Sequence, residues 1–216
     1  MARPRTAKSA TETEGKTIVL GVTGASGALF ARRTVQMLEA DPRVGRIHLV
    51  VSGSGLKVMR EELQLDLGRS AVVASRLAGG PTPKTIYLLD SDIGASIASG
   101  SYRVDGMVVV PCSTGCLAQI SNGISSTLIE RAADVCLKER RPLVLAVRDT
   151  PLSRVHLENM LRAHDAGARI FPIVPSFYHA PRSIDDLVTQ FCCRMLAHLG
   201  LEQSEQFRWK GEGDGR

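Results

Sequence analysis

The amino-acid sequence predicts an α/β fold: a three-layer, Rossmann-like or flavodoxin-like parallel sheet with helices on both faces. Short apolar runs rich in β-branched residues alternate with helical patterns along the chain, and such alternation is typical of a parallel sheet with crossover helices. The runs are apolar at nearly every position, as expected for strands that are buried on both faces. Ligands of such sheets bind beyond the carboxyl ends of the strands, so the residues that follow each strand are the first candidates for a site.

Each element is placed by its own pattern. The continuous apolar runs predict strands at residues 17–22, 46–51, 106–110, 143–147 and 169–174. Helical spacing of apolar residues predicts helices at about residues 26–40, 56–63 and 183–199, with further helices between the other strands. One domain, residues 17–210, is expected between two polar tails, residues 1–16 and 211–216, which lack periodicity and are expected to be disordered.

Composition excludes several classes of protein. No apolar run approaches the ~18 to 20 residues that span a bilayer, and the N-terminus lacks the apolar segment of a secretory signal. The net charge is only +5, and no basic stripe interleaves with aromatic residues, so nucleic-acid binding is not supported. The five cysteines are an odd number without metal-binding spacing. We therefore expect reduced, buried thiols, no metal and no membrane contact, in a cytoplasmic protein.

A turn of small residues follows the first predicted strand, at residues 21–28 (GVTGASGA). Its spacing is GxxGxxG, and no acidic residue ends the second strand, where Val50, Val51 and Ser52 stand. An NAD site that binds a ribose is therefore disfavoured. Free N–H groups at a helix start suit the phosphate of FMN; a tight turn without a ligand is the alternative.

Two further segments follow later strands. Residues 110–116 (VPCSTGC) place hydroxyls and N–H groups at a helix start, and would form a second wall of the same crevice. Cys112 has no histidine nearby in sequence, so a buried thiol is expected there. Arg148 and Asp149 stand at a strand's carboxyl end, where Thr150 before a proline predicts the N-cap of the next helix. A purely structural Arg–Asp pair is the alternative.

Several cationic and aromatic residues are candidates for an anion site. Arg131, Asp134 and Lys138 share one helical face; the spacing fits equally a solvated face with an Asp134–Lys138 pair and two cations aimed at a phosphate. Tyr178 lies in a stiff, proline-rich loop and can both donate a hydrogen bond and pack against an apolar ligand. Arg194 lies at the edge of an apolar helix stripe, so we expect a partly desolvated guanidinium that needs an anion.

The chain resembles the UbiX family of flavin prenyltransferases from about Lys16 to Trp209. Six segments in the same order carry the resemblance: residues 21–28, 96–101 (SIASGS), 105–113 (DGMVVVPCS), 130–143 (ERAADVCLKERRPL), 148–160 (RDTPLSRVHLENM) and 167–188 (GARIFPIVPSFYHAPRSIDDLV). The resemblance implies a single FMN-binding flavoprotein domain that transfers a dimethylallyl group from dimethylallyl phosphate to N5 and C6 of reduced FMN without a metal. It also implies a homododecamer with sites at subunit contacts, and a UbiD-type decarboxylase that receives the prenylated FMN.

The resemblance also implies roles for single residues. FMN is expected to contact Gly24, Ala25, Ser26, Ser52, Ser113, Thr114, Gly115, Cys116 and Arg148. Dimethylallyl phosphate is expected to contact Arg131, Lys138, Tyr178 and Arg194. The residues expected to act in catalysis are Ser26, Glu62, Asp149 and Lys138, with Glu61 as the alternative to Glu62.

Two positions depart from the family pattern. The usual run after the loop serine is a larger residue, lysine and threonine, whereas this chain has Thr114, Gly115 and Cys116. The usual glutamate after the flavin-binding arginine is Asp149, which is one methylene shorter. Two other functions stay open: an FMN-dependent cysteine-peptide decarboxylase, and a flavin carrier without turnover.

Overall fold

The computed structural model describes residues 15–67 and 70–208. Residues 1–14 of the expected N-terminal tail, the whole expected C-terminal tail and the last two residues of the expected domain lie outside the described residues. Six strands form one sheet in the order β3-β2-β1-β4-β5-β6, and every neighbouring pair is parallel. The strands are β1 (Lys16–Val22), β2 (Val44–Val51), β3 (Thr85–Leu89), β4 (Gly106–Cys112), β5 (Leu143–Val147) and β6 (Arg169–Ile170). Lys16, the last residue of the expected N-terminal tail, thus opens the first strand.

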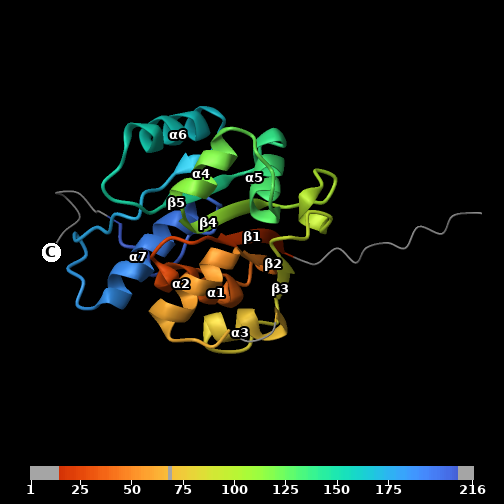
Figure 1. Ribbon diagram of the computed structural model, residues 1–216. Helices are drawn as coiled ribbons and strands as arrows, with labels where there is room; N and C mark the ends of the chain where they lie inside the picture. The colour runs from red at the N-terminus through yellow and green to blue at the C-terminus, as the bar shows by residue number, and fades with distance from the viewer. Residues whose placement is uncertain (1–14, 68–69, 209–216) are drawn as a thin grey trace, which may run out of the picture.

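Helices cover both faces of the sheet, which confirms the expected three-layer α/β fold (Figure 1). One face carries α1 (Ala28–Ala40), α2 (Gly53–Leu63), α3 (Val73–Ala78) and α7 (Ile184–Ala197). The other face carries α4 (Thr114–Ser121), α5 (Leu128–Lys138) and α6 (Arg154–Asp165). No helix within residues 15–67 and 70–208 is long and apolar enough to cross a membrane.

Alternate residues of each central strand enter two apolar clusters on opposite faces of the sheet. Ile18 and Leu20 of β1 pack with α1 and α7, whereas Val19 packs with α4 and α5. Every residue of β4 is buried, because helices cover both of its faces. Each fully buried aliphatic side chain contributes roughly 1.5 to 3 kcal/mol. This rigid centre fixes the strand ends from which the candidate site residues project.

Three local expectations were incomplete or wrong. Strand β3 was not predicted; it is a half-exposed edge strand, so its pattern is not continuously apolar. Strand β6 is shorter than expected and ends at Ile170, although the N–H groups of Phe171 and Ile173 still donate to the carbonyls of Leu145 and Val147 at 2.9 Å each. Thr150 is not the N-cap of α6. Ser153 caps that helix by accepting from the N–H of His156, while the N–H of Thr150 is donated to Asp149.

Candidate active site

The carboxyl ends of β1 and β4 are joined by the side chain of Thr23. Its hydroxyl donates to the carbonyl of Pro111 at 2.9 Å and accepts from the N–H of Ser113 at 2.7 Å. Thr23 is buried, so the contact is shielded from water. The turn at residues 24–27 and the loop at residues 113–116 are therefore held side by side, as the sequence predicted for two walls of one crevice. Thr23 itself was not singled out, although it lies within the small-residue turn.

Two serines start helices at this edge of the sheet. The Ser52 hydroxyl accepts from the N–H of Gly55 at 3.0 Å and caps α2. The Ser113 hydroxyl accepts from the N–H of Cys116 at 3.3 Å and caps α4. Both helices direct their positive ends toward the crevice, which is an arrangement that favours an anionic group. A Cβ on Gly24 would lie 2.4 Å from the side chain of Ser54, so the turn packs directly against the start of α2.

Glu62 reaches across from the last turn of α2 to the start of α1. Its carboxylate accepts from the N–H groups of Gly27 at 3.0 Å and Ala28 at 2.8 Å, and from the Ser26 hydroxyl. Partial burial acts to raise the pKa of Glu62. The pKa is nevertheless lower than usual, because the carboxylate accepts hydrogen bonds from Ser26, Ala28 and Gly27 and lies near the charge of Arg148.

This geometry bears on two expectations. It favours Glu62 over Glu61 as the carboxylate of the crevice, because Glu62 contacts Ser26. It also changes the expected use of the first turn. The N–H groups of Gly27 and Ala28, which lie at the helix start where the phosphate of FMN was expected, already donate to a carboxylate, and a phosphate beside it would be repelled. The starts of α2 and α4 remain the places for an anion.

Asp149 faces the loop after β4 rather than its neighbour in sequence. Oδ2 accepts from the Thr114 hydroxyl at 3.2 Å, and Oδ1 accepts from the N–H of Thr150 at 2.8 Å. Among the ion pairs of the described residues, none joins Arg148 to Asp149, so the structural Arg–Asp pair is not formed. A side chain at Gly115 would meet no atom within 4 Å, so space is open where the family has a lysine.

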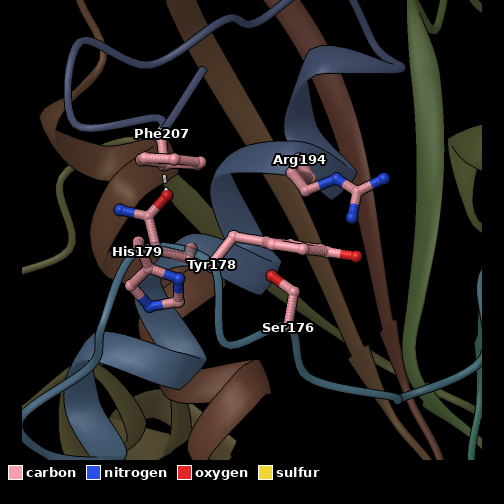
Figure 2. Close-up of a pocket in the computed structure, with 6 residues that line it drawn as sticks. Ser176, Tyr178, His179, Arg194 and Phe207 are labelled. Carbon is pink, nitrogen blue, oxygen red and sulfur yellow. Dashed lines mark hydrogen bonds between the residues drawn. The ribbon is translucent and has the colours of Figure 1, made fainter. Parts of the chain in front are cut away.

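Tyr178 and Arg194 lie together in a cavity of about 530 Å³ beside α7 (Figure 2). Six residues line it: Ser176, Tyr178, His179, Gln190, Arg194 and Phe207. The expectation of a partly desolvated Arg194 is wrong for the single chain, where the side chain is exposed. Cys193 and Met195 take the buried positions on either side of it. None of the lining residues belongs to the crevice between β1 and β4.

Arg131 and Lys138 lie on α5, which covers the face of the sheet opposite to α7. Only four residues separate Lys138 from the amino end of β5, so it lies at the sheet edge opposite Arg148. The Arg131 guanidinium contacts Asp134 at 2.9 Å and the carbonyl of Ala98 at 3.1 Å. The ammonium of Lys138 lies 3.8 Å from Glu139, so the possible Asp134–Lys138 pair is replaced by two others.

The cysteines follow the expectation from their spacing. All five are free and buried, and Cys112 is completely inaccessible to solvent. Burial raises the pKa of Cys136 and of Cys192 to about 12 each. Thiols with such values are poor nucleophiles. Among the residues that the structure describes, no cluster of His, Cys, Asp or Glu has the arrangement of a metal site.

Known proteins with similar sequences are flavoproteins. A family model described as Flavoprotein matches residues 6–194. Flavin prenyltransferase UbiX of Halalkalibacterium halodurans is 43% identical over 196 residues, which cover 90% of this chain and 94% of that protein. Flavin prenyltransferase UbiX of Pseudomonas aeruginosa is 40% identical over 196 residues, which cover 89% of this chain and 93% of that protein. The sequence match therefore extends over nearly all of both proteins.

Solved structures give the same result. AnUbiX (PadA1) in complex with FMN and dimethylallyl pyrophosphate has a TM-score of 0.80 at 41% identity, covering 91% of this chain and 98% of that one. A dodecameric FMN-dependent UbiX-like decarboxylase from Escherichia coli O157:H7 has a TM-score of 0.79 at 40% identity, and the match covers 90% of this chain and 100% of that one. The cysteine decarboxylase TvaF, at 13% identity and a TM-score of 0.56, shares only the fold. The chain belongs to the Flavoprotein family and, within it, to the UbiX flavin prenyltransferases.

Proposed function

We propose that this protein is a flavin prenyltransferase that transfers a dimethylallyl group from dimethylallyl phosphate to N5 and C6 of reduced FMN. The observation that carries the proposal is the crevice in which Ser26, Glu62 and Arg148 meet at the carboxyl edge of the sheet. Sequence identity of about 40% to UbiX flavin prenyltransferases over nine-tenths of the chain supports the proposal. A relative crystallised with FMN and dimethylallyl pyrophosphate supports both substrates.

The residues at this edge fit FMN. The capped starts of α2 and α4 offer N–H groups to its phosphate, and the close packing of Gly24 on Ser54 keeps the turn thin. We propose that FMN contacts the residues expected from the resemblance: Gly24, Ala25, Ser26, Ser52, Ser113, Thr114, Gly115, Cys116 and Arg148. Reduced FMN supplies the nucleophilic N5 and C6 atoms when it is bound.

Transfer requires that the donor's C–O bond breaks, with the electron pair leaving on the phosphate. Arg194 and Tyr178 stabilise that phosphate from the cavity beside α7, because a cation and a hydroxyl donor bind a developing anion more strongly than the intact ester. We propose that Arg131 and Lys138 do the same from a neighbouring chain. The bonds to N5 and C6 each displace a proton, and the donor's double bond takes up one proton during ring closure, so one net proton is released with the phosphate. Glu62, Asp149 and the departing phosphate are the groups that exchange these protons.

Glu62 suits a role as proton acceptor at neutral pH. Its lowered pKa keeps the carboxylate ionised, and the Ser26 hydroxyl that donates to it offers a relay toward the crevice. Asp149 is held by Thr114 and Thr150 on the other wall. We propose that Glu62 accepts the proton through Ser26 and that Asp149 orients the flavin.

The oligomeric state, the recipient of the product and the location in the cell are also proposals. A dodecameric relative and the separation of the donor-binding residues within one chain support a homododecamer with composite sites. Prenylated FMN is a cofactor of decarboxylation, so we propose a UbiD-type decarboxylase as its recipient. Reduced cysteines without disulfides favour the cytoplasm.

Anaerobic incubation with reduced FMN and dimethylallyl phosphate tests the proposal. We expect mass spectrometry to show FMN heavier by one isoprene unit, together with stoichiometric inorganic phosphate. FMN that is bound but recovered unchanged would instead identify a flavin carrier. Release of carbon dioxide from a peptide with a C-terminal cysteine, in place of prenyl transfer, would identify a cysteine-peptide decarboxylase.

A further inference from the structure

The chain beyond α7 returns along that helix and is held by the side chain of Gln190. The amide nitrogen of Gln190 donates to the carbonyl of Glu205 at 2.7 Å, and its amide oxygen accepts from the N–H of Phe207 at 2.7 Å. Both ends of the amide are used, so its orientation is fixed by its partners. The bond donated by the Phe207 N–H is the dashed line beside Phe207 in Figure 2.

This anchoring places the Phe207 ring in the cavity wall. The ring lies 6.3 Å, between centroids, from the imidazole of His179. Figure 2 shows both rings at one end of the cavity, while the Arg194 guanidinium and the Tyr178 hydroxyl lie at the other. The cavity therefore has an aromatic end, formed by a phenyl ring and an imidazole, and a cationic end. Such a cavity is complementary to a ligand with a short apolar tail and an anionic head.

We infer that Phe207 forms the wall for the tail of the prenyl donor, and that Gln190 is the positioning residue that holds this wall in place. The inference rests on the proposed function, which places the donor phosphate at Arg194. Phe207 is 41% exposed, so a tail that packs on the ring removes apolar surface from water on both partners. A fixed ring also limits the length of tail that fits between it and the bound phosphate. Phe207 thus selects a five-carbon donor over longer allylic phosphates.

The first test is binding without turnover, with oxidised FMN bound and dimethylallyl phosphate as the titrant in calorimetry. Phe207→Ala and Gln190→Ala are each expected to weaken dimethylallyl phosphate about tenfold, the usual effect of losing apolar contact in a pocket. Inorganic phosphate, which has no tail, is expected to bind all variants as it binds the parent. Because Gln190 acts through Phe207, the double variant is expected to bind dimethylallyl phosphate no worse than Phe207→Ala.

Turnover gives an independent measure. Phe207→Ala is expected to raise the ratio of kcat/KM for geranyl phosphate to that for dimethylallyl phosphate at least about tenfold, while Phe207→Leu restores most of the parental ratio. Gln203→Ala is the matched control, since Gln203 lies in the same returning segment but bonds to Asp41 and Leu201. It is expected to keep parental binding and parental ratio.

The outcomes separate the two levels of the proposal. A parent that transfers no prenyl group refutes the proposed function, whereas the calorimetry still reports on Phe207. Thermal unfolding accompanies each variant to show that it is folded. Folded Phe207→Ala and Gln190→Ala proteins with parental affinity for dimethylallyl phosphate and a parental ratio of donors would overturn the inference.

Discussion

Thr114 donates a hydrogen bond to Asp149 at 3.2 Å, which joins the two positions where this chain departs from the family pattern. The shorter carboxylate of Asp149 is thus held from the facing wall of the crevice. Its other oxygen accepts from the N–H of Thr150. The two substitutions therefore form one unit, in which a hydroxyl on α4 fixes the direction of a carboxylate after β5.

Loss of this hydroxyl tests the unit. Thr114→Val keeps the shape of the side chain but cannot donate, so we expect kcat for prenyl transfer to fall about fivefold. The estimate corresponds to ~1 kcal/mol for one hydrogen bond. Thr114→Ser is expected to retain most of the rate. Stopped-flow measurement of flavin absorbance under anaerobic conditions provides kcat. Equal rates in the valine and serine variants would show that the bond has no role in turnover.

The Glu62 carboxylate is expected to make stability depend on pH. Its pKa is lowered in the folded protein, so its contribution is fully present above the unfolded value near 4.5 and is lost as the pH falls through the folded value. Glu62→Gln is therefore expected to have a lower Tm than the parent at pH 7. The two proteins are expected to converge as the pH falls through the folded value. Glu61→Gln is the matched control, and a Tm gap that widens on acidification would contradict the assignment.

Gly100 is expected to position the cations of α5. A Cβ at Gly100 would lie 2.3 Å from Glu139 and 3.3 Å from the Lys138 ammonium, and Arg141 holds the loop by donating to the Gly100 carbonyl at 2.7 Å. Gly100→Ala must therefore displace Glu139 or the loop. We expect a KM for dimethylallyl phosphate raised at least about threefold, with unchanged FMN affinity. Gly80→Ala, where a Cβ meets nothing within 4 Å, is the control and should keep the parental KM.

The parts of the fold that could be predicted are those whose signal is local. Strands β1, β4 and β5 are buried on both faces, so burial alone makes their residues apolar throughout. Strand β3 pairs with only one neighbour and exposes Leu89, so its sequence carries no comparable signal. Thr150 has a side chain that suits an N-cap, yet the helix begins after Ser153. There the side chains of Ser153 and His156 each accept a hydrogen bond from the other residue's backbone N–H.

The candidate site shows the same division. Small residues at strand ends identified the crevice, because the position of a turn after a strand is readable from the chain. The Glu62 contact with the start of α1 joins residues 34 and 35 positions apart, and no spacing rule specifies it. The exposure of Arg194 could not be predicted either. Helical periodicity predicts which face of the helix a side chain lies on, but not whether another segment packs on that face. The contact between Gln190 and Phe207 depends on the return of the chain along α7, which no local pattern predicts.

The separation of Lys138 from Arg194 leads to the last prediction. Lys138 ends α5 on one face of the sheet, whereas Arg194 lies on α7, which covers the opposite face. If both bind one phosphate, they must come from different chains. Arg194→Ala and Lys138→Ala homo-oligomers are each expected to lose at least about tenfold in turnover, since a charge-assisted hydrogen bond contributes roughly 1.5 to 3 kcal/mol. Both are expected to retain FMN.

Mixed oligomers of the two variants then distinguish a composite site from a site within one chain. Dissociation and reassembly of an equal mixture creates contacts in which one chain supplies an intact Arg194 and its neighbour an intact Lys138. We expect activity in the mixture to exceed that of either variant alone by several-fold, although each chain carries a disabling substitution. The double variant Arg194→Ala/Lys138→Ala, mixed with itself, is the control because no intact pair can form. Light scattering and native mass spectrometry establish that mixing has occurred. Mixed oligomers as inactive as the separate variants would show that the two cations do not share a phosphate across chains.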